Sequence, residues 1–214
     1  MKDRILKTSQ LQAIRVFDKG EELIIPANED LQCDYRRLQS GVQDVKVRKS
    51  LVERLYNVQK RLKKHSEGLQ LILVEGYRSP EYQERYYLNE LFVRCHGNSG
   101  LDFSQMLEHV HQFVALPSVA GHPTGGAIDL TLAINGCEIP MGGEKADFSC
   151  PELLPTFSPL TTSEQTYWRS VLHDAMVSEG FAPFYGEWWH FSYGDREWAA
   201  FYGHSEALYG PLYE

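Results

Sequence analysis

Two apolar patterns of different period mark the first half of the chain. The first recurs every three to four residues between Ser50 and about His65, which predicts an amphipathic helix with one face against a sheet. The stripe consists of Leu51, Leu55, Val58 and Leu62. The second is an almost unbroken aliphatic run from Leu69 to Val74, which has the length and composition of a buried strand.

Turn and capping signals predict the elements that follow. Ser79-Pro80 predicts the start of a helix that runs to about Val93, because proline suits the first helical position. Another helix is expected from Phe103 to Ala115. Ala127 to Ile134 is rich in strand formers, and Asn135-Gly136 after it predicts a tight hairpin.

The last third predicts a helix and two paired strands. Either Thr161-x-x-Glu164 or Thr162-x-x-Gln165 forms a capping box for a helix that stops at Gly180. The strands are expected at residues 181–185 and 187–193. Helices mixed with antiparallel strands indicate an α+β domain. Residues 1–45 hold only short apolar runs and predict no element.

Composition and charge fit one folded domain without a polyanionic partner. The 214 residues are 43% hydrophobic, enough for a buried core over residues 1–214. The net charge is −8, from 21 basic and 29 acidic residues, so nucleic acid is not an expected partner. The short basic run at Lys60-Arg61-Leu62-Lys63-Lys64 is interpreted as a solvated helix end.

Export, membrane and redox signals are weak. The N-terminal sequence lacks the apolar core of a signal peptide, and no window approaches the roughly 18 apolar residues of a membrane span. The expectation is therefore a cytoplasmic protein with no membrane partner. The cysteines are Cys33, Cys95, Cys137 and Cys150. Since they show no C-x-x-C spacing, reduced thiols are expected rather than a thiolate metal site.

Two clusters of titratable residues carry the candidate chemistry: His122 with Asp129, and Glu187 with His190. A catalytic zinc takes three protein ligands from His and carboxylate groups and keeps one position for water. Two His and one Asp satisfy that count, and they leave Glu187 as an acid-base group that is not a ligand. Taken one at a time, each residue also has an ordinary structural interpretation.

The spacing within each cluster sets a geometric requirement. His122 and Asp129 are seven residues apart, so they converge only if the Gly125-Gly126 turn folds them toward one point. Glu187 and His190 fall on opposite faces of a regular strand, so a shared site requires a bend near Trp188. The other histidines are assigned to packing or the surface; they are His65, His96, His109, His111, His173 and His204.

From about Leu69 to Tyr193 the chain resembles the zinc D-alanyl-D-alanine dipeptidases of vancomycin resistance, within the D-Ala-D-Ala metallopeptidases that share a fold with the hedgehog domain. The motifs that carry the resemblance are Gly76-Tyr77-Arg78, His122-x-x-Gly125-x-Ala127-x-Asp129-Leu130-Thr131, Pro140-Met141-Gly142, Gly180-Phe181 and Glu187-Trp188-Trp189-His190. The resemblance implies a single α+β domain with a central, mainly antiparallel sheet flanked by helices.

The resemblance also implies a role for each site residue. His122, Asp129 and His190 would hold one Zn²⁺ per chain, with Glu187 as general base and then general acid. Arg78 would stabilise the oxyanion, although an ion pair at the strand exit is the alternative. Asp147 would bind the substrate ammonium. Glu144 competes for this last role, because the segment is one residue longer than in the family.

One departure concerns substrate choice: Ala120 stands where the family has a serine that helps to bind substrate. The expected activity is hydrolysis of D-Ala-D-Ala or a similar small D-amino-acid dipeptide, in peptidoglycan turnover. The alternatives are a D,D-carboxypeptidase or endopeptidase on the same scaffold, and a non-catalytic metal-binding module. The sequence predicts no oligomeric state.

Overall fold

The computed structural model describes residues 5–26, 31–37, 44–97 and 100–213. Its central sheet has the order β3 (Gln32–Cys33), β5 (Leu69–Glu75), β6 (Ala127–Ile134), β9 (His190–Ser192) and β8 (Ala182–Pro183), and β7 (Cys137–Glu138) also pairs with β6. Within this sheet only β3 runs parallel to its neighbour, β5; the other described pairs of the sheet are antiparallel. The expectation of a central, mainly antiparallel sheet in an α+β fold is confirmed.

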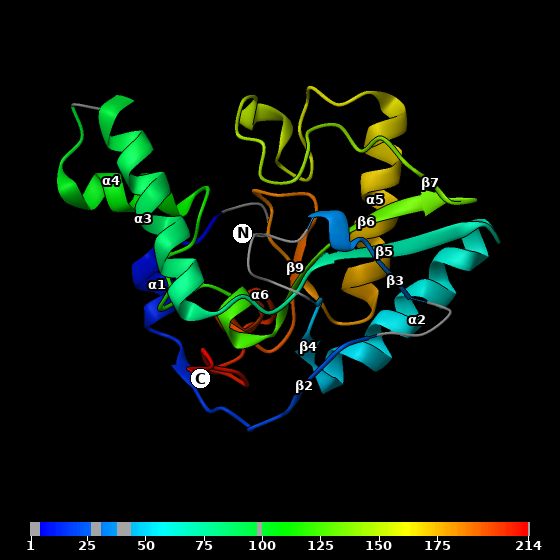
Figure 1. The fold of residues 1–214 in the computed structure, drawn as a ribbon, viewed down its shortest axis with the longest axis horizontal. Coiled ribbons are helices and arrows are strands. Elements are labelled where there is room, and N and C mark those ends of the chain that lie inside the picture. Colours follow the sequence, from blue (N-terminus) through cyan, green and yellow to red (C-terminus); the bar gives the residue numbers. More distant parts are fainter. Residues whose placement is uncertain (1–4, 27–30, 38–43, 98–99, 214) are drawn as a thin grey trace.

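Two long helices, α2 (Lys49–His65) and α5 (Ser163–Ser178), pack on the sheet and on each other (Figure 1). The stripe predicted for α2 faces the core, with its four apolar side chains fully buried. These contact buried sheet residues that include Leu71, Leu73, Leu130 and Leu132. Burial of this much apolar surface is the main force that holds the helices on the sheet.

A second helical pair, α3 (Pro80–Gly97) and α4 (Phe103–His111), lies at the left of Figure 1, on the other side of the site from α5. The predicted start of α3 is confirmed, with the Ser79 hydroxyl accepting the Tyr82 N–H, but the helix continues beyond Val93. The predicted helix to Ala115 was too long, because α4 ends at His111. The segment that follows it forms part of a pocket wall.

Turn chemistry was predicted more accurately than strand length. Asn135 and Gly136 both have positive φ, 51° and 79°, as a two-residue hairpin turn requires. Thr162, rather than Thr161, caps α5 in a capping box with Gln165. The strands expected at residues 181–185 and 187–193 are much shorter, since β8 has two residues and β9 has three.

Short elements fill the N-terminal segment and return to the C-terminus. Helix α1 (Thr8–Gln12) contacts α6 (Arg196–Tyr202), and β1 (Arg15–Val16) pairs in parallel with β10 (Glu206–Ala207). β2 (Leu23–Ile24) pairs with β4 (Val47–Arg48). The 3-10 helices are η1 (Tyr35–Arg37), η2 (His122–Thr124) and η3 (Pro151–Leu153). The sequence predicted none of the N-terminal elements, and residues 1–4, 27–30 and 38–43 lie outside the described part.

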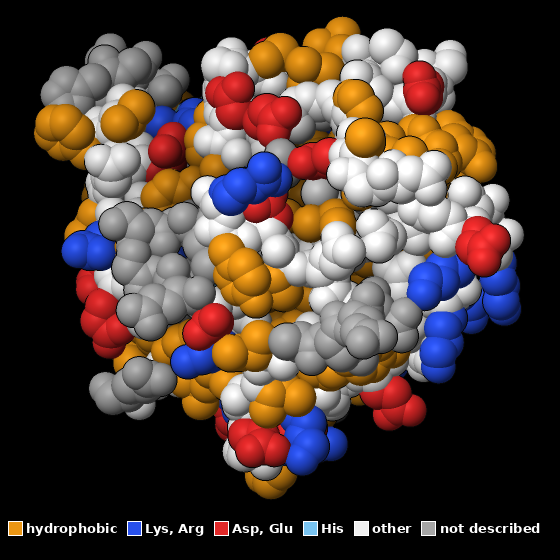
Figure 2. Space-filling model, turned by 45° about the vertical axis from the view of Figure 1, so that its right-hand side comes forward, with side chains coloured by type: hydrophobic (Ala, Val, Ile, Leu, Met, Phe, Trp, Pro, Cys, Tyr) orange, Lys and Arg blue, Asp and Glu red, His pale blue; other side chains and the backbone are white. Residues whose placement is uncertain are grey.

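The surface agrees with the charge pattern of the sequence. On the face shown in Figure 2, acidic and basic side chains are interspersed, apart from a group of basic side chains at the right edge. The charged residues of the basic run near the end of α2 are exposed, as expected of a solvated helix end. All four cysteines are free thiols. Among the described helices, none combines the length and apolar character needed to cross a membrane.

Candidate metal centre and active site

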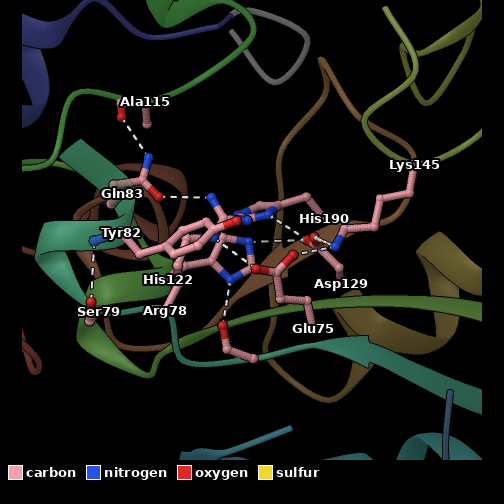
Figure 3. A network of polar contacts seen from close by, with 11 residues as sticks. Glu75, Arg78, Ser79, Tyr82, Gln83, Ala115, His122, Asp129, Lys145 and His190 are labelled. Carbon is pink, nitrogen blue, oxygen red and sulfur yellow. Dashed lines mark hydrogen bonds and ion pairs between the residues drawn. The ribbon is translucent and has the colours of Figure 1, made fainter. Parts of the chain in front are cut away.

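Three of the predicted residues converge at the centre of the sheet (Figure 3). His122 from η2, Asp129 from β6 and His190 from β9 each offer a ligand atom, and these atoms lie within 4.8 Å of one another. Asp129 Oδ1 is 2.8 Å from His190 Nδ1 and 3.3 Å from His122 Nε2. Asp129 and His190 are also direct partners in the register of β6 and β9.

The backbone around His122 fixes its ring orientation. Gly125 ends η2 in the left-handed region, with φ 70°, so the chain turns sharply between His122 and the strand that carries Asp129. The His122 Nδ1–H donates to the Gly76 carbonyl at 2.7 Å, and this bond leaves Nε2 to face Asp129. A carbonyl partner on the remote nitrogen is typical of metal-binding histidines. The predicted convergence through the Gly-Gly turn is confirmed.

The pKa shifts of two of the three residues, His122 and Asp129, favour metal binding. Burial lowers the pKa of His122, which keeps its imidazole neutral as a ligand must be. Burial opposes ionisation of Asp129, but neighbouring His122 and Lys145 outweigh it and hold the pKa of this carboxyl well below its usual range. Two imidazoles and one carboxylate form the donor set of a catalytic zinc site, so the residues present fit this ion.

Glu187 lies in the same pocket, but it is not a member of the metal-binding trio. The chain turns at Trp188 and Trp189, and the His190 N–H bonds back to the Glu187 carbonyl at 3.3 Å. This turn is the bend that the sequence required, and it brings both side chains to one pocket. Burial raises the pKa of Glu187 to about 7, although His190 opposes the shift. A carboxyl group with this pKa can both accept and release a proton near neutral pH.

Arg78 lines the pocket and is also held by an ion pair, so the two interpretations of this residue coexist. Its side chain is only 5% exposed. Nε donates to Glu75 Oε1 at 2.8 Å, and Nη1 donates to Gln83 Oε1 at 2.8 Å. Gln83 in turn donates to the Ala115 carbonyl. The guanidinium is therefore a fixed positive charge at the pocket wall.

Sequence reasoning missed two charged residues at the centre, Glu75 and Lys145. Glu75 is fully buried at the end of β5, where it pairs with Arg78 and with the Lys145 ammonium. Lys145 also reaches Asp129 Oδ2, at 3.2 Å. A carboxylate that ends an aliphatic run directly before Gly76-Tyr77-Arg78 was a usable signal for Glu75. Nothing in the pattern around Lys145 indicated its partners.

The structure does not bring the two candidates for ammonium binding to the site. Asp147 and Glu144 are exposed, and neither is among the residues that line the pocket. The Asp147 carboxylate instead accepts the Ser149 N–H at 2.9 Å. Their neighbour Ala146 does line the pocket. The role predicted for Asp147 therefore stays a prediction.

One wall of the pocket is apolar and contains the position where this chain departs from the motif. It includes Phe113, Val114, Val119 and Ala120. His111, only 3% exposed, lines the same wall, so it is a packing residue that also reaches the pocket. Ala120 is buried there without a polar side-chain atom.

Comparisons with known proteins identify the family of this chain. A family model described as D-ala-D-ala dipeptidase matches residues 41–206. A D-alanyl-D-alanine dipeptidase from Synechocystis sp. is 28% identical over 177 residues, which cover 72% of this chain and 71% of the relative.

The chain is also similar to solved structures, and the first of these shares its fold. The LdcB LD-carboxypeptidase aligns with a TM-score of 0.51 and 21% identity, over 88% of this chain and 78% of that chain. The vancomycin resistance D,D-dipeptidase VanXYg, solved with a D-Ala-D-Ala phosphinate analogue, aligns with a TM-score of 0.41 and 21% identity, over 94% of this chain and 71% of that chain.

Proposed function

Because the chain belongs to the D-Ala-D-Ala dipeptidase family and is thus a metallopeptidase, we propose that it is a zinc-dependent dipeptidase acting on D-Ala-D-Ala or a similar D-amino-acid dipeptide. The proposal includes one Zn²⁺ per chain and a single peptidase domain over residues 1–214. One observation carries it: the ligand atoms of His122, Asp129 and His190 meet in the pocket that Glu187 and Arg78 also line.

His122, Asp129 and His190 would hold the ion through Nε2, Oδ1 and Nδ1, the atoms that face one another. When bound, zinc supplies Lewis-acid polarisation of the scissile carbonyl and lowers the pKa of water. Glu187 then accepts the proton of the attacking water and passes it to the leaving amine. Its raised pKa suits both transfers, since a general base works best with a pKa near the working pH.

Arg78 stabilises the negative charge that develops on the carbonyl oxygen of the scissile bond. The two hydrogen bonds that Arg78 donates to Glu75 and Gln83 hold the guanidinium before substrate arrives, so little reorganisation accompanies the reaction. Among the described residues, the third guanidinium nitrogen, Nη2, has no protein hydrogen-bond partner and is free to donate to that oxygen.

Recognition of the substrate ammonium by Asp147 belongs to the proposal as well. Its carboxylate faces solvent in this structure, so the role requires this side chain, on the segment from Gly142 to Asp147, to turn toward the pocket. Positive φ at Gly142, Gly143 and Ala146 shows that this segment already turns sharply. Ala146 at the pocket edge puts Asp147 one residue away from the site.

The outward position of Asp147 favours one alternative, a D,D-carboxypeptidase on the same scaffold. A carboxypeptidase acts on a longer peptide and needs no acid for a free ammonium group next to the scissile bond. The apolar wall around Ala120 would then contact the D-Ala residues of that peptide.

A paired assay tests the proposal. The purified protein is analysed for bound metal, and D-Ala release is measured from D-Ala-D-Ala, from N-acetyl-D-Ala-D-Ala and from a longer peptide ending in D-Ala-D-Ala. A dipeptidase cleaves the free dipeptide and discriminates against the acetylated one, which lacks the ammonium group. Cleavage of the longer peptide alone would establish the carboxypeptidase, and bound zinc without any hydrolysis would contradict both.

A further inference from the structure

Lys145 occupies an unusual position for a lysine. It lies on the loop after β7, yet its side chain is only 11% exposed and points into the centre of the site (Figure 3). Its Nζ contacts Glu75 Oε2 and lies 3.2 Å from Asp129 Oδ2. A lysine is rarely buried unless its charge is paired, and here two buried carboxylates pair it.

The two carboxylates explain why a cation is needed there. Glu75 and Asp129 are direct partners in the register of β5 and β6, and their side chains are 0% and 3% exposed. Like charges directly opposite each other in an antiparallel pair repel, and burial strengthens the repulsion. The Lys145 ammonium lies against one oxygen of each and offsets this repulsion.

Each carboxylate uses its two oxygens for different partners. Asp129 turns Oδ1 toward His190 and His122 and leaves Oδ2 to Lys145. Glu75 gives Oε1 to Arg78 and Oε2 to Lys145. A continuous chain of ion pairs therefore runs from a proposed metal ligand, through Lys145 and Glu75, to the proposed oxyanion cation.

We propose that Lys145 is a positioning residue that orients Asp129 toward the metal and, through Glu75, holds Arg78 at the pocket wall. A ligand carboxylate is fixed when its second oxygen is bound, and loss of such partners weakens metal binding by about tenfold to a hundredfold. Lys145 does not touch substrate in this role. The inference rests on the proposed function, because it assigns Asp129 to the metal.

The test compares Lys145→Met with Lys145→Arg. Zinc affinity is measured at fixed pH by competition with a chromophoric chelator, and kcat and KM for D-Ala-D-Ala are measured on fully loaded protein. Lys145→Met keeps the length of the side chain but loses the charge. It should weaken zinc binding by about tenfold or more and lower kcat more than it changes KM. Lys145→Arg retains the charge and should lose less of both.

Lys49→Met is the matched control. Lys49 forms an ion pair with Glu22 at 2.9 Å, but both side chains are more than 60% exposed and lie outside the site. Removal of this exposed pair should leave zinc affinity and kinetics unchanged. Melting curves establish that each variant is folded. If Lys145→Met does not fold, the Glu75→Gln/Lys145→Met double variant, which removes both charges of the pair, should show the same loss of affinity.

Two results would overturn the inference. Tighter zinc binding by Lys145→Met would mean that the ammonium competes with the metal for Asp129, and unchanged affinity and kcat would mean that the contacts are passive. Both results presuppose a wild-type protein that binds zinc and hydrolyses D-Ala-D-Ala. Failure of the wild type itself would count against the proposed function, so the two failures are distinguishable.

Discussion

Asp129 and His190 face each other across β6 and β9 as register partners, with Oδ1 and Nδ1 2.8 Å apart. Glu75 is the partner of Asp129 on the other side, across β5 and β6. The centre of the site is thus a row of three residues across three adjacent strands, and of the three candidate metal ligands only His122 comes from outside the sheet. A site on strands is held more precisely than one on loops.

Glu187→Ala separates the proton-transfer role from metal binding. Glu187 lies beside the three ligands without being one of them, so the variant should bind zinc with near wild-type affinity. Turnover should fall by about a hundredfold to ten-thousandfold, the usual contribution of a general base. Metal analysis and steady-state kinetics check this. Loss of zinc from the variant would mean that the assigned roles are wrong, and His190→Ala is the comparison expected to lose it.

The raised pKa of Glu187 predicts a pH-dependent stability effect in metal-free protein. Below about pH 4.5 the carboxyl is protonated in both the folded and the unfolded chain, so it does not reduce the stability of the folded state. As pH rises toward 7 only the unfolded chain ionises, so the folded state loses stability, and the full cost persists above pH 7.

Glu187→Gln removes this cost and should raise the free energy of unfolding by up to about 3 kcal/mol at pH 8. Thermal melts of the metal-free proteins should therefore show a higher Tm for the variant at pH 8 and no difference near pH 4. A variant that is less stable than wild type at pH 8 would contradict the buried, destabilised carboxylate. The same substitution should abolish turnover, which means that Glu187 lowers the stability of the folded protein but is required for its activity.

Arg78→Lys tests the oxyanion role with least damage to the buried carboxylate. A lysine keeps a positive charge near Glu75 but loses the forked geometry that also reaches Gln83. We expect kcat to fall by about a hundredfold, equivalent to about 3 kcal/mol of transition-state stabilisation, with zinc content unchanged. A change in KM alone would instead assign Arg78 to ground-state binding.

Ala120→Ser tests whether the missing hydroxyl sets substrate preference. Ala120 is buried in the pocket wall, so a serine there adds one hydrogen-bonding group facing the substrate. One such bond contributes about 1 kcal/mol net, and KM for D-Ala-D-Ala should fall several-fold. A panel of dipeptides of both chiralities measures the effect. Ala120→Val, which adds bulk without a hydroxyl, is the control and should not lower KM.

The sequence predicted that His122, Asp129 and His190 converge because the signals for it are local. A Gly-Gly turn beside His122, a strand containing Asp129, and three-residue spacing between Glu187 and His190 can each be read without knowing the fold. The required bend at Trp188 was predictable for the same reason. Helices α2 and α5 were predicted from apolar spacing and a capping box, which are also local features.

Features that depend on distant partners were not predictable. Lys145 contacts Glu75, which lies 70 residues earlier in the sequence, and no pattern around either residue encodes that contact. The strands near the N-terminus have two residues each, too short for any period to be recognised. Asp147 was chosen from its order in a motif, and that order does not encode the direction of its side chain, which is exposed here.

The β6–β9 pairing has a consequence for how the protein acquires its metal. Asp129 and His190 are 61 residues apart, so their contact closes a long loop and forms only when β9 joins the sheet. A growing chain holds no complete ligand set until His190 has been synthesised. All three proposed ligands can therefore hold the metal only once β9 has joined the sheet. Chains that load the metal gain the binding free energy as stability, and those that do not are more exposed to proteolysis.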